Sequence, residues 1–314
     1  MGKEYNNASF QGGGGVNRTT VLILGGTGML GHVLFRRLSL NPDLIVHATA
    51  RSLSGIENSF SAESRTRIRT DVNANNFDEV IRALAAIQPD VVINCIGLIK
   101  QLPLASDPLA SITVNAQLPH RITMICRAAK ARMIHISTDC VFDGKKGGYT
   151  ENDPPNADDL YGQTKMLGEV SYPHSVTLRS SIIGHELKAR FGLIEWFLSQ
   201  REPVRGYTKA IYSGFTTVEM ARIISDFVLP NPKLSGIYNL SSAPISKHDL
   251  LQLVARRYRK NIEIRPYDGF VIDRSLDSTL FRTQTGYAPP SWDKLVEEMH
   301  SDYLAHVESY HAVV

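Results

Sequence analysis

The sequence is poor in cysteine and carries little net charge. Its 314 residues include only three cysteines, Cys95, Cys126 and Cys140, and none lies in a CxxC pair or a zinc-binding spacing. A disulfide framework is therefore excluded, and we expect a cytoplasmic protein without a structural metal. Thirty-four Lys and Arg against 31 Asp and Glu leave a charge of +3, which argues against a nucleic-acid groove or a polybasic membrane anchor.

Long apolar runs are also missing. No stretch approaches the roughly 18 uncharged apolar residues of a membrane span, and residues 1–18 contain no apolar segment of a secretory signal. These residues are polar and include four glycines in a row, so we expect a flexible leader outside the fold. The overall composition, 43% apolar and 21% charged, can build a full core.

Short apolar runs alternate with helical patterns from Thr19 to about residue 183. The expected strands are 21–24, 44–50, 91–94, 133–137 and 175–178, and the expected helices are 29–40, 78–87, 115–131 and 161–170. Strands that alternate with helices at this spacing predict an α/β fold with a doubly wound, parallel Rossmann sheet.

The alternation loosens after about residue 184. Helices are expected at 193–198, 219–228 and 248–257, and a short strand at 262–264. We therefore predict an NAD(P)-binding domain over residues 19–183 and a smaller, mainly substrate-binding lobe over residues 184–314. One strand near 236–241 is expected to return from the lobe to the main sheet.

A glycine-rich turn follows the first predicted strand and opens the first helix. In the segment GGTGMLG at 25–31, Gly25 permits a tight turn, Gly28 lets backbone N–H groups approach a pyrophosphate, and Gly31 lets the helix pack on the strand. The alternative is a glycine-rich turn without a ligand. The strand-turn-helix context favours a dinucleotide site.

The residue after the second strand indicates which dinucleotide is preferred. NAD-selective folds often place an acid there for the ribose 2′-OH, whereas this chain has Arg51, whose planar guanidinium suits a 2′-phosphate. NADP(H) is therefore favoured over NAD(H). The alternative is that Arg51 is a solvated surface arginine. Asp71 could approach the adenine, or it could equally be an acid of a loop.

Tyr161 and Lys165 are four residues apart and would share one face of a helix. A nearby ammonium favours the phenolate and would lower the pKa of the tyrosine from about 10. Such a phenol can give a proton to a carbonyl oxygen while hydride arrives at the carbon. Thr138, at the end of a predicted strand, could hydrogen-bond the same oxygen. A surface tyrosine and a capping threonine are the alternative.

At this point the chain resembles the extended, nucleotide-sugar branch of the short-chain dehydrogenase/reductases, and within it the dTDP-4-dehydrorhamnose reductases. The segments that carry the likeness are GGTGMLG at 25–31, VVINCIG at 91–97, VNA at 114–116, STDCVFDG at 137–144, YGQTKMLGE at 161–169 and LRSS at 178–181. The likeness covers residues 20 to about 185 well, and the rest only in general plan.

The resemblance implies roles for individual residues. The catalytic set would be Thr138, Tyr161 and Lys165, and Lys165 would also hold the nicotinamide ribose. The cofactor-binding residues would be Gly25, Thr27, Gly28, Met29, Leu30, Gly31, Arg51, Asp71, Val72, Cys95, Gly97, Leu98, Ile99, Asn115, Tyr161 and Lys165. The sugar would contact Thr138, Asp139 and Ile182.

Two residues depart from the family pattern. Cys140 replaces a usual tyrosine, and Ile182 replaces a tryptophan that lies against the sugar, so the identity of the sugar is open. The acidic residues that bind metal in some of these reductases cannot be located, and no metal is implied. The oligomeric state is also open, with a homodimer among the alternatives.

The resemblance implies NADPH-dependent reduction of a nucleotide-activated 4-keto-6-deoxy sugar. One alternative is an epimerase or dehydratase that retains NAD, although Asp139 is followed by Cys140 instead of the glutamate of dehydratases. Another is a non-catalytic NADP-binding subunit like that of methionine adenosyltransferase. Three arginines, Arg179, Arg205 and Arg274, are unranked candidates for a substrate diphosphate.

Overall fold

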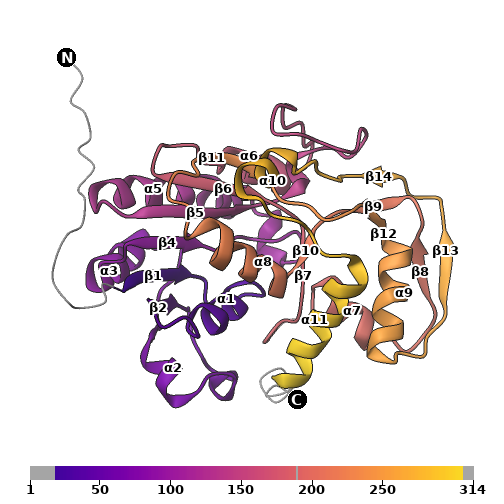
Figure 1. Cartoon of the computed structure of the whole chain (residues 1–314), viewed down its shortest axis with the longest axis horizontal. Coiled ribbons are helices and arrows are strands. Elements are labelled where there is room, and N and C mark those ends of the chain that lie inside the picture. The colour runs from indigo at the N-terminus through magenta and orange to yellow at the C-terminus, as the bar shows by residue number, and fades with distance from the viewer. Residues whose placement is uncertain (1–17, 189, 307–314) are drawn as a thin grey trace.

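A seven-stranded parallel sheet forms the centre of the molecule. The structure, a computed structural model, describes residues 18–188 and 190–306, and the predicted leader lies almost wholly outside them. The strands are β1 (Thr19–Leu24), β2 (Leu44–Thr49), β3 (Ile68–Arg69), β4 (Val91–Asn94), β5 (Arg132–Ser137), β6 (Ser175–Arg179) and β11 (Gly236–Asn239). Their order, β11-β6-β5-β4-β1-β2-β3, reverses direction between β1 and β4 (Figure 1). The predicted doubly wound fold is confirmed.

Both faces of the sheet are covered, which explains why its strands read as continuous apolar runs. Val21 and Ile23 point to one face, in a core with α1 (Gly31–Leu38), α8 (Thr217–Ile223) and α11 (Trp292–Ala305). Leu22 and Leu24 point to the other face, against α3 (Phe77–Ile87) and α5 (Leu118–Ala128). Figure 1 shows α1 and α8 on the opposite side of the strands from α5.

Helix boundaries differ from the sequence prediction in informative ways. The helix expected from residue 115 begins earlier, with α4 (Pro108–Ser111), a wide π-helical turn at Ile112–Gln117 and then α5. Asp107 caps α4 by accepting hydrogen bonds from the amides of Leu109 and Ala110, at 2.9 and 3.4 Å. The helix α6 (Leu160–Leu167) is shorter than the predicted 161–170.

Short elements make up the lobe on the right of Figure 1. They include β7 (Ile182–Ile183), α7 (Leu193–Ser199), β8 (Val204–Tyr207), β9 (Ala210–Tyr212), β10 (Phe215–Thr216), β12 (Ile245–Ser246), α9 (Lys247–Tyr258), β13 (Ile264–Tyr267) and β14 (Ile272–Asp273). The helix α10 (Thr279–Thr285) lies instead against β11 of the main sheet. The strand predicted at 262–264 corresponds to β13, which pairs with β8. The expected return to the sheet is β11, and α8 accompanies it by packing beside α1.

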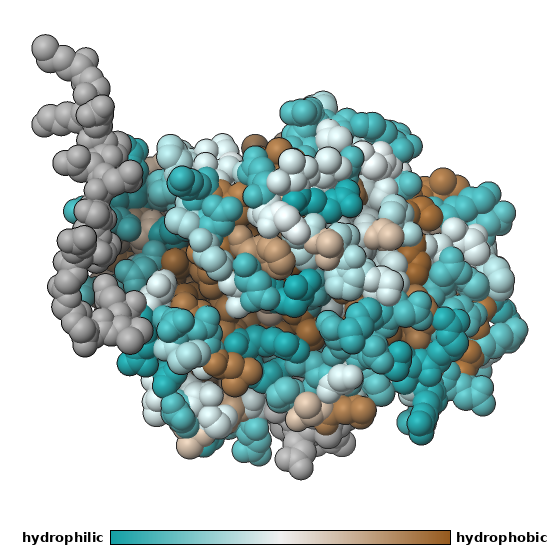
Figure 2. Space-filling view, in the orientation of Figure 1, coloured by the Kyte–Doolittle hydropathy of each residue, from teal (hydrophilic) through white to brown (hydrophobic). Residues whose placement is uncertain are grey.

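The lobe and the sheet share one continuous apolar core, because Ile23 of β1 and Val254 of α9 belong to the same cluster of buried side chains. The domain boundary near residue 184 therefore stays a prediction. Figure 2 shows hydrophilic residues over most of the visible face, with hydrophobic residues gathered between them. Within residues 18–188 and 190–306, no helix is long and apolar enough to cross a membrane.

Candidate active site

The turn between β1 and α1 depends on glycine at two positions. Gly25 has a φ of +84°, in the left-handed region. A Cβ on Gly31 would lie 2.1 Å from the Gly25 carbonyl oxygen, so the helix can begin this close to the strand only with glycine. Within this turn Gly28 is exposed, and no side chain caps α1. Backbone N–H groups at an open helix N-terminus suit a pyrophosphate, so the turn fits a dinucleotide.

Arg51 and Asp71 lie side by side at the end of β2, as the predicted adenosine end of the site requires. The amide of Asp71 donates to the Arg51 carbonyl at 3.3 Å, and the amide of Val72 donates to the Ala50 carbonyl at 3.1 Å. Val72 is buried and both charged residues are exposed. In the part of the chain that the structure describes, the Arg51 guanidinium has no hydrogen-bond or ion-pair partner, so it is available to a ligand.

The loop after β4 forms the opposite wall of the glycine turn. Gly25 and Ile96 are close enough that a Cβ on Gly25 would lie 3.1 Å from the Ile96 side chain. Asn115 holds this loop by accepting from the Leu98 amide at 2.8 Å and donating to the Leu98 carbonyl at 3.0 Å. Its amide also reaches the Thr164 hydroxyl of α6 at 3.4 Å. Asn115 is therefore a brace between the loop and α6.

The remaining loop residues are arranged as a partly exposed wall. Cys95, Gly97, Leu98 and Ile99 are neither fully buried nor fully exposed. Burial raises the pKa of the Cys95 thiol to about 12, against the opposing effect of Lys165. A thiol with that pKa stays neutral and is a packing residue, not a nucleophile.

The three predicted catalytic residues come together at the carboxyl end of β5. Lys165 is buried and donates from Nζ to the carbonyl of Ile136 at 2.7 Å. Thr138 follows two residues after Ile136, and its hydroxyl is within hydrogen-bonding reach of the Tyr161 phenol. The i, i+4 pair on α6 and the strand end therefore form one cluster, next to the point where the sheet order reverses.

The electrostatics of the cluster differ from the sequence prediction. Burial, then Cys140, raises the pKa of Tyr161 above its usual value, and the hydrogen bond with Thr138 only partly opposes them. Asp139 and Asp159 raise the pKa of this phenol further. The pKa of Lys165 is lowered to about 8 by burial, against the raising effects of Glu169 and Cys95. The predicted lowering of the Tyr161 pKa by Lys165 is wrong here, since desolvation dominates and the ammonium binds a carbonyl.

The two predicted sugar contacts beyond Thr138 are Asp139 and Ile182, and Asp139 belongs to this cluster. Asp139 is buried, accepts a hydrogen bond from the Thr138 hydroxyl at 3.2 Å, and raises the pKa of Tyr161. Ile182 lies in β7, the short strand that follows β6, and is partly exposed. Contact of either residue with a sugar stays a prediction.

Arg274 brings a charge from the lobe to the cluster. It donates from Nε to the Phe142 carbonyl at 2.8 Å, and its Nη1 lies 3.7 Å from the Cys140 sulfur. Arg179, by contrast, is buried in a bidentate pair with Glu169 at 2.7 Å for both bonds. Arg205 is exposed and stacks over Tyr267. The structure thus separates the three arginines: Arg179 is committed to Glu169, Arg205 lies over Tyr267, and Arg274 lies beside Cys140.

Lys100 is a neighbour that the sequence analysis missed. Its ammonium lies 5.5 Å from the centre of the Tyr161 ring and 2.6 Å from a carboxylate oxygen of Asp159. Asp159 in turn caps α6 by accepting from the Gly162 amide at 2.9 Å. The position of Lys100, just past the motif VVINCIG, could have drawn attention to it, but its partner is 59 residues away.

Comparison with known proteins places this site in a family. The reductase Agl14 of Haloferax volcanii, described as a probable low-salt glycan biosynthesis reductase, is 30% identical over 166 residues, 51% of this chain and 52% of that protein. The methionine adenosyltransferase 2 subunit beta of Bos taurus is 30% identical over 149 residues, 48% of this chain and 41% of that protein. The chain thus spans about half or less of the length of these relatives.

A solved structure has the same fold over nearly the whole chain. The dTDP-4-dehydrorhamnose reductase of Bacillus anthracis, in complex with NADP, matches with a TM-score of 0.74 at 18% identity, over 91% of this chain and 98% of that one. The model of the family described as the RmlD substrate binding domain matches residues 19–305. The resemblance inferred from the motifs is therefore confirmed, and the chain belongs to the RmlD substrate-binding-domain family.

Proposed function

We propose that this chain is a nicotinamide-dependent reductase of a nucleotide-activated keto sugar, with a 4-keto-6-deoxy sugar as substrate and NADP(H) favoured over NAD(H). The observation that carries the proposal is the convergence of Thr138, Tyr161 and Lys165 beside an open glycine turn. An alcohol, a phenol and an amine at one strand end suit proton transfer to a carbonyl oxygen.

Some residues of the candidate site would bind the cofactor, and others would bind the ketone and donate a proton to it. The pyrophosphate would lie at the turn of Gly28 to Leu30, on the amides of Met29 and Leu30, since the Gly28 amide donates to the Gly25 carbonyl at 3.0 Å. The 2′-phosphate would lie on Arg51, and the nicotinamide ribose near Lys165. When bound, NADPH supplies the hydride. Thr138 would hydrogen-bond the ketone oxygen, and Tyr161 would donate its proton to that oxygen. At neutral pH the phenol carries the proton that this step needs. Burial raises its pKa, which makes it a weaker acid, so the role requires that the bound cofactor and ketone favour the phenolate that forms.

Arg274 would contact the diphosphate of the substrate. It is the lobe arginine beside Cys140, and a guanidinium suits a phosphate geometrically. This role would orient the sugar from the side opposite the glycine turn. The partial exposure of Ile182 leaves room at the sugar edge where related reductases have a larger ring.

A binding subunit without catalysis is the second candidate. The similarity to the methionine adenosyltransferase subunit favours it, at 30% identity over nearly half the chain. An epimerase or dehydratase with retained NAD is less favoured, because the exposed Arg51 suits an exchangeable NADP(H) and Cys140 follows Asp139.

One experiment separates these functions. The purified chain is mixed with NADPH or NADH and a panel of 4-keto nucleotide sugars, and the absorbance of the reduced cofactor is followed. We expect consumption with NADPH and at least one ketone. Binding of NADPH without consumption with any ketone would favour the subunit. Product formation from a sugar without net cofactor turnover would favour the epimerase or dehydratase.

A further inference from the structure

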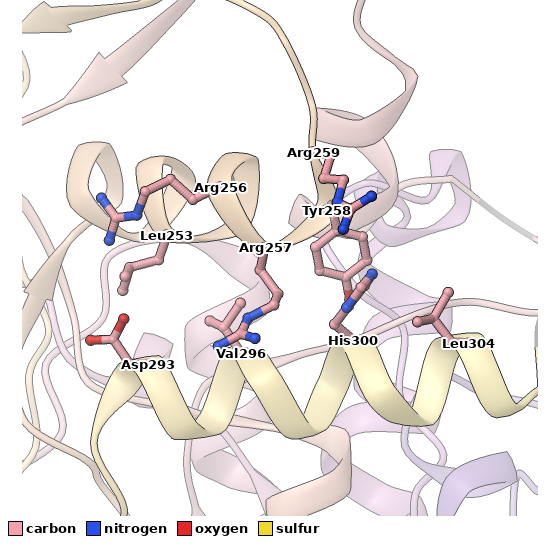
Figure 3. Close-up of a pocket in the computed structure, with 9 residues that line it drawn as sticks. All are labelled: Leu253, Arg256, Arg257, Tyr258, Arg259, Asp293, Val296, His300 and Leu304. Carbon is pink, nitrogen blue, oxygen red and sulfur yellow. The ribbon is translucent and has the colours of Figure 1, made fainter.

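A cavity lies between α9 and α11, and none of its lining residues belongs to the candidate active site. Its volume is about 610 Å³, within the range of small-ligand pockets. Figure 3 shows the residues that line it, with the last turn of α9 facing the long helix α11. The lining residues are Leu253, Arg256, Arg257, Tyr258, Arg259, Asp293, Val296, His300 and Leu304.

Positive charge dominates this cavity. Three arginines and a single acid, Asp293, are among the lining residues. One of the arginines, Arg257, forms an ion pair of 3.3 Å with Glu297. Among the described residues, the guanidinium groups of Arg256 and Arg259 have no hydrogen-bond or ion-pair partner. Elsewhere the chain does supply acids to paired arginines, as where Arg36 and Arg37 share the buried Asp302.

These guanidinium groups do not cap the C-terminal carbonyls of α9. The carbonyl of Ala255 accepts the backbone amide of Lys260 at 2.9 Å, and Arg259, with a φ of +53°, closes the helix by donating its own amide to Ala255 and Arg256. Because backbone amides satisfy these carbonyls, the arginine side chains are not needed to cap the helix and can bind an anion.

The floor of the cavity is held in place. The Tyr258 hydroxyl lies 2.8 Å from Nε2 of His185, and its ring meets the His300 ring edge to face at 4.5 Å. The His300 imidazole is half-buried, and burial followed by the charges of Arg257, His185 and Arg259 lowers its pKa. The same positive surroundings that disfavour a proton on His300 favour an anion.

We propose that this cavity binds the phosphate group of a small organic molecule. Guanidinium forks hold phosphate oxygens in a bidentate geometry, and here two forks without a partner among the described residues, on Arg256 and Arg259, line the cavity at opposite ends (Figure 3). The side chains of Leu253, Val296 and Leu304 offer an apolar wall to the organic part. This site is independent of the proposed reductase activity and lies outside the glycine turn that would hold a dinucleotide.

Calorimetry on the full chain tests the site directly. Phenyl phosphate is titrated into the protein in the presence of saturating NADP⁺, with benzoate as a monoanion of the same ring. We expect one phenyl phosphate site with a Kd of about 1 mM or tighter, and much weaker binding of benzoate. The double variant Arg256→Gln/Arg259→Gln should weaken phenyl phosphate binding at least about tenfold.

A matched control is Arg265→Gln, which removes an exposed arginine that pairs with Glu263 at 2.9 Å, outside this cavity. It should bind phenyl phosphate like the parent protein. Thermal unfolding of every variant verifies that it is folded. Absence of binding to the parent protein, or equal affinity in the double variant, would overturn the proposal. Equally tight binding of hexaglutamate would also overturn it, since the cavity would then be a general anion surface.

Discussion

The two parts of the molecule place their functional groups in different ways. In the sheet, Thr138 follows β5, the glycine turn follows β1 and the Leu98 loop follows β4, so one rule, the carboxyl ends of parallel strands, brings them together. In the lobe, Arg274 reaches the site through β14, a strand of two residues. The predicted chemistry therefore depends on topology in the sheet and on long-range packing in the lobe.

The largest effect is expected when the proton donor, Tyr161, is removed from the cluster at the end of β5. In Tyr161→Phe the ring remains on α6, but no proton is available to the ketone oxygen. We expect turnover to fall by about 100-fold or more, while the Kd of NADPH stays within about twofold of the parent value. Steady-state kinetics and cofactor titration measure both. Retention of parental turnover would refute the role of Tyr161 as the proton donor.

The second test concerns cofactor choice at the edge of the sheet. In Arg51→Asp an acid replaces the unpartnered guanidinium, which would repel a 2′-phosphate and accept a ribose hydroxyl. The ratio of kcat/KM for NADPH to that for NADH should fall by about tenfold or more. Arg67→Gln, a surface arginine that pairs with Glu63 at 2.7 Å, is the control. An unchanged ratio would mean that Arg51 is a solvated side chain.

What the sequence predicted follows the same division. The longer strands of the sheet, the glycine turn and the Tyr161–Lys165 pair were predictable because periodicity and short motifs are local signals. The two-residue strand β3 and most of the short strands of the lobe were not predicted, since they are too short to show a period. The partners of Lys100 and Arg274 were not, since Asp159 and Cys140 are far away in the chain. The π-helical turn before α5 was missed as well, because the helix was predicted to begin only at residue 115, near the end of that turn.

The pKa of Tyr161 illustrates a further limit. An i, i+4 spacing predicts that two side chains share a helix face, but it carries no information about what else each of them meets. Lys165 reaches back to the Ile136 carbonyl, and burial governs the phenol. Residue types and spacing therefore identified the members of the cluster but not the sign of the shift.

The third test concerns the lobe and the role of Arg274 in binding the diphosphate. Arg274→Gln removes the charge beside Cys140 and keeps a hydrogen-bonding group for the Phe142 carbonyl. We expect the KM for the nucleotide sugar to rise about tenfold, with a smaller change in kcat, because diphosphate binding precedes the chemistry. Arg205→Gln is the matched lobe control and should leave the KM unchanged. Equal effects of the two variants would remove the assignment of Arg274 to the diphosphate.

The smallest expected effect is a pH dependence of stability on the sheet side. The pKa of Lys165 is about 8 in the folded chain against an ordinary value of 10.5. Between those values the unfolded chain holds a proton that the folded chain has released, so folding becomes more favourable as the pH rises, by up to about 1.4 kcal/mol per unit. Lys165→Met lacks this contribution. Urea unfolding of both proteins at two pH values, about 7.5 and 9.5, should show the parent gaining roughly 2 kcal/mol relative to the variant. Parallel pH profiles would mean that the folded structure does not disfavour the Lys165 charge, and the low pKa assigned to it would be wrong.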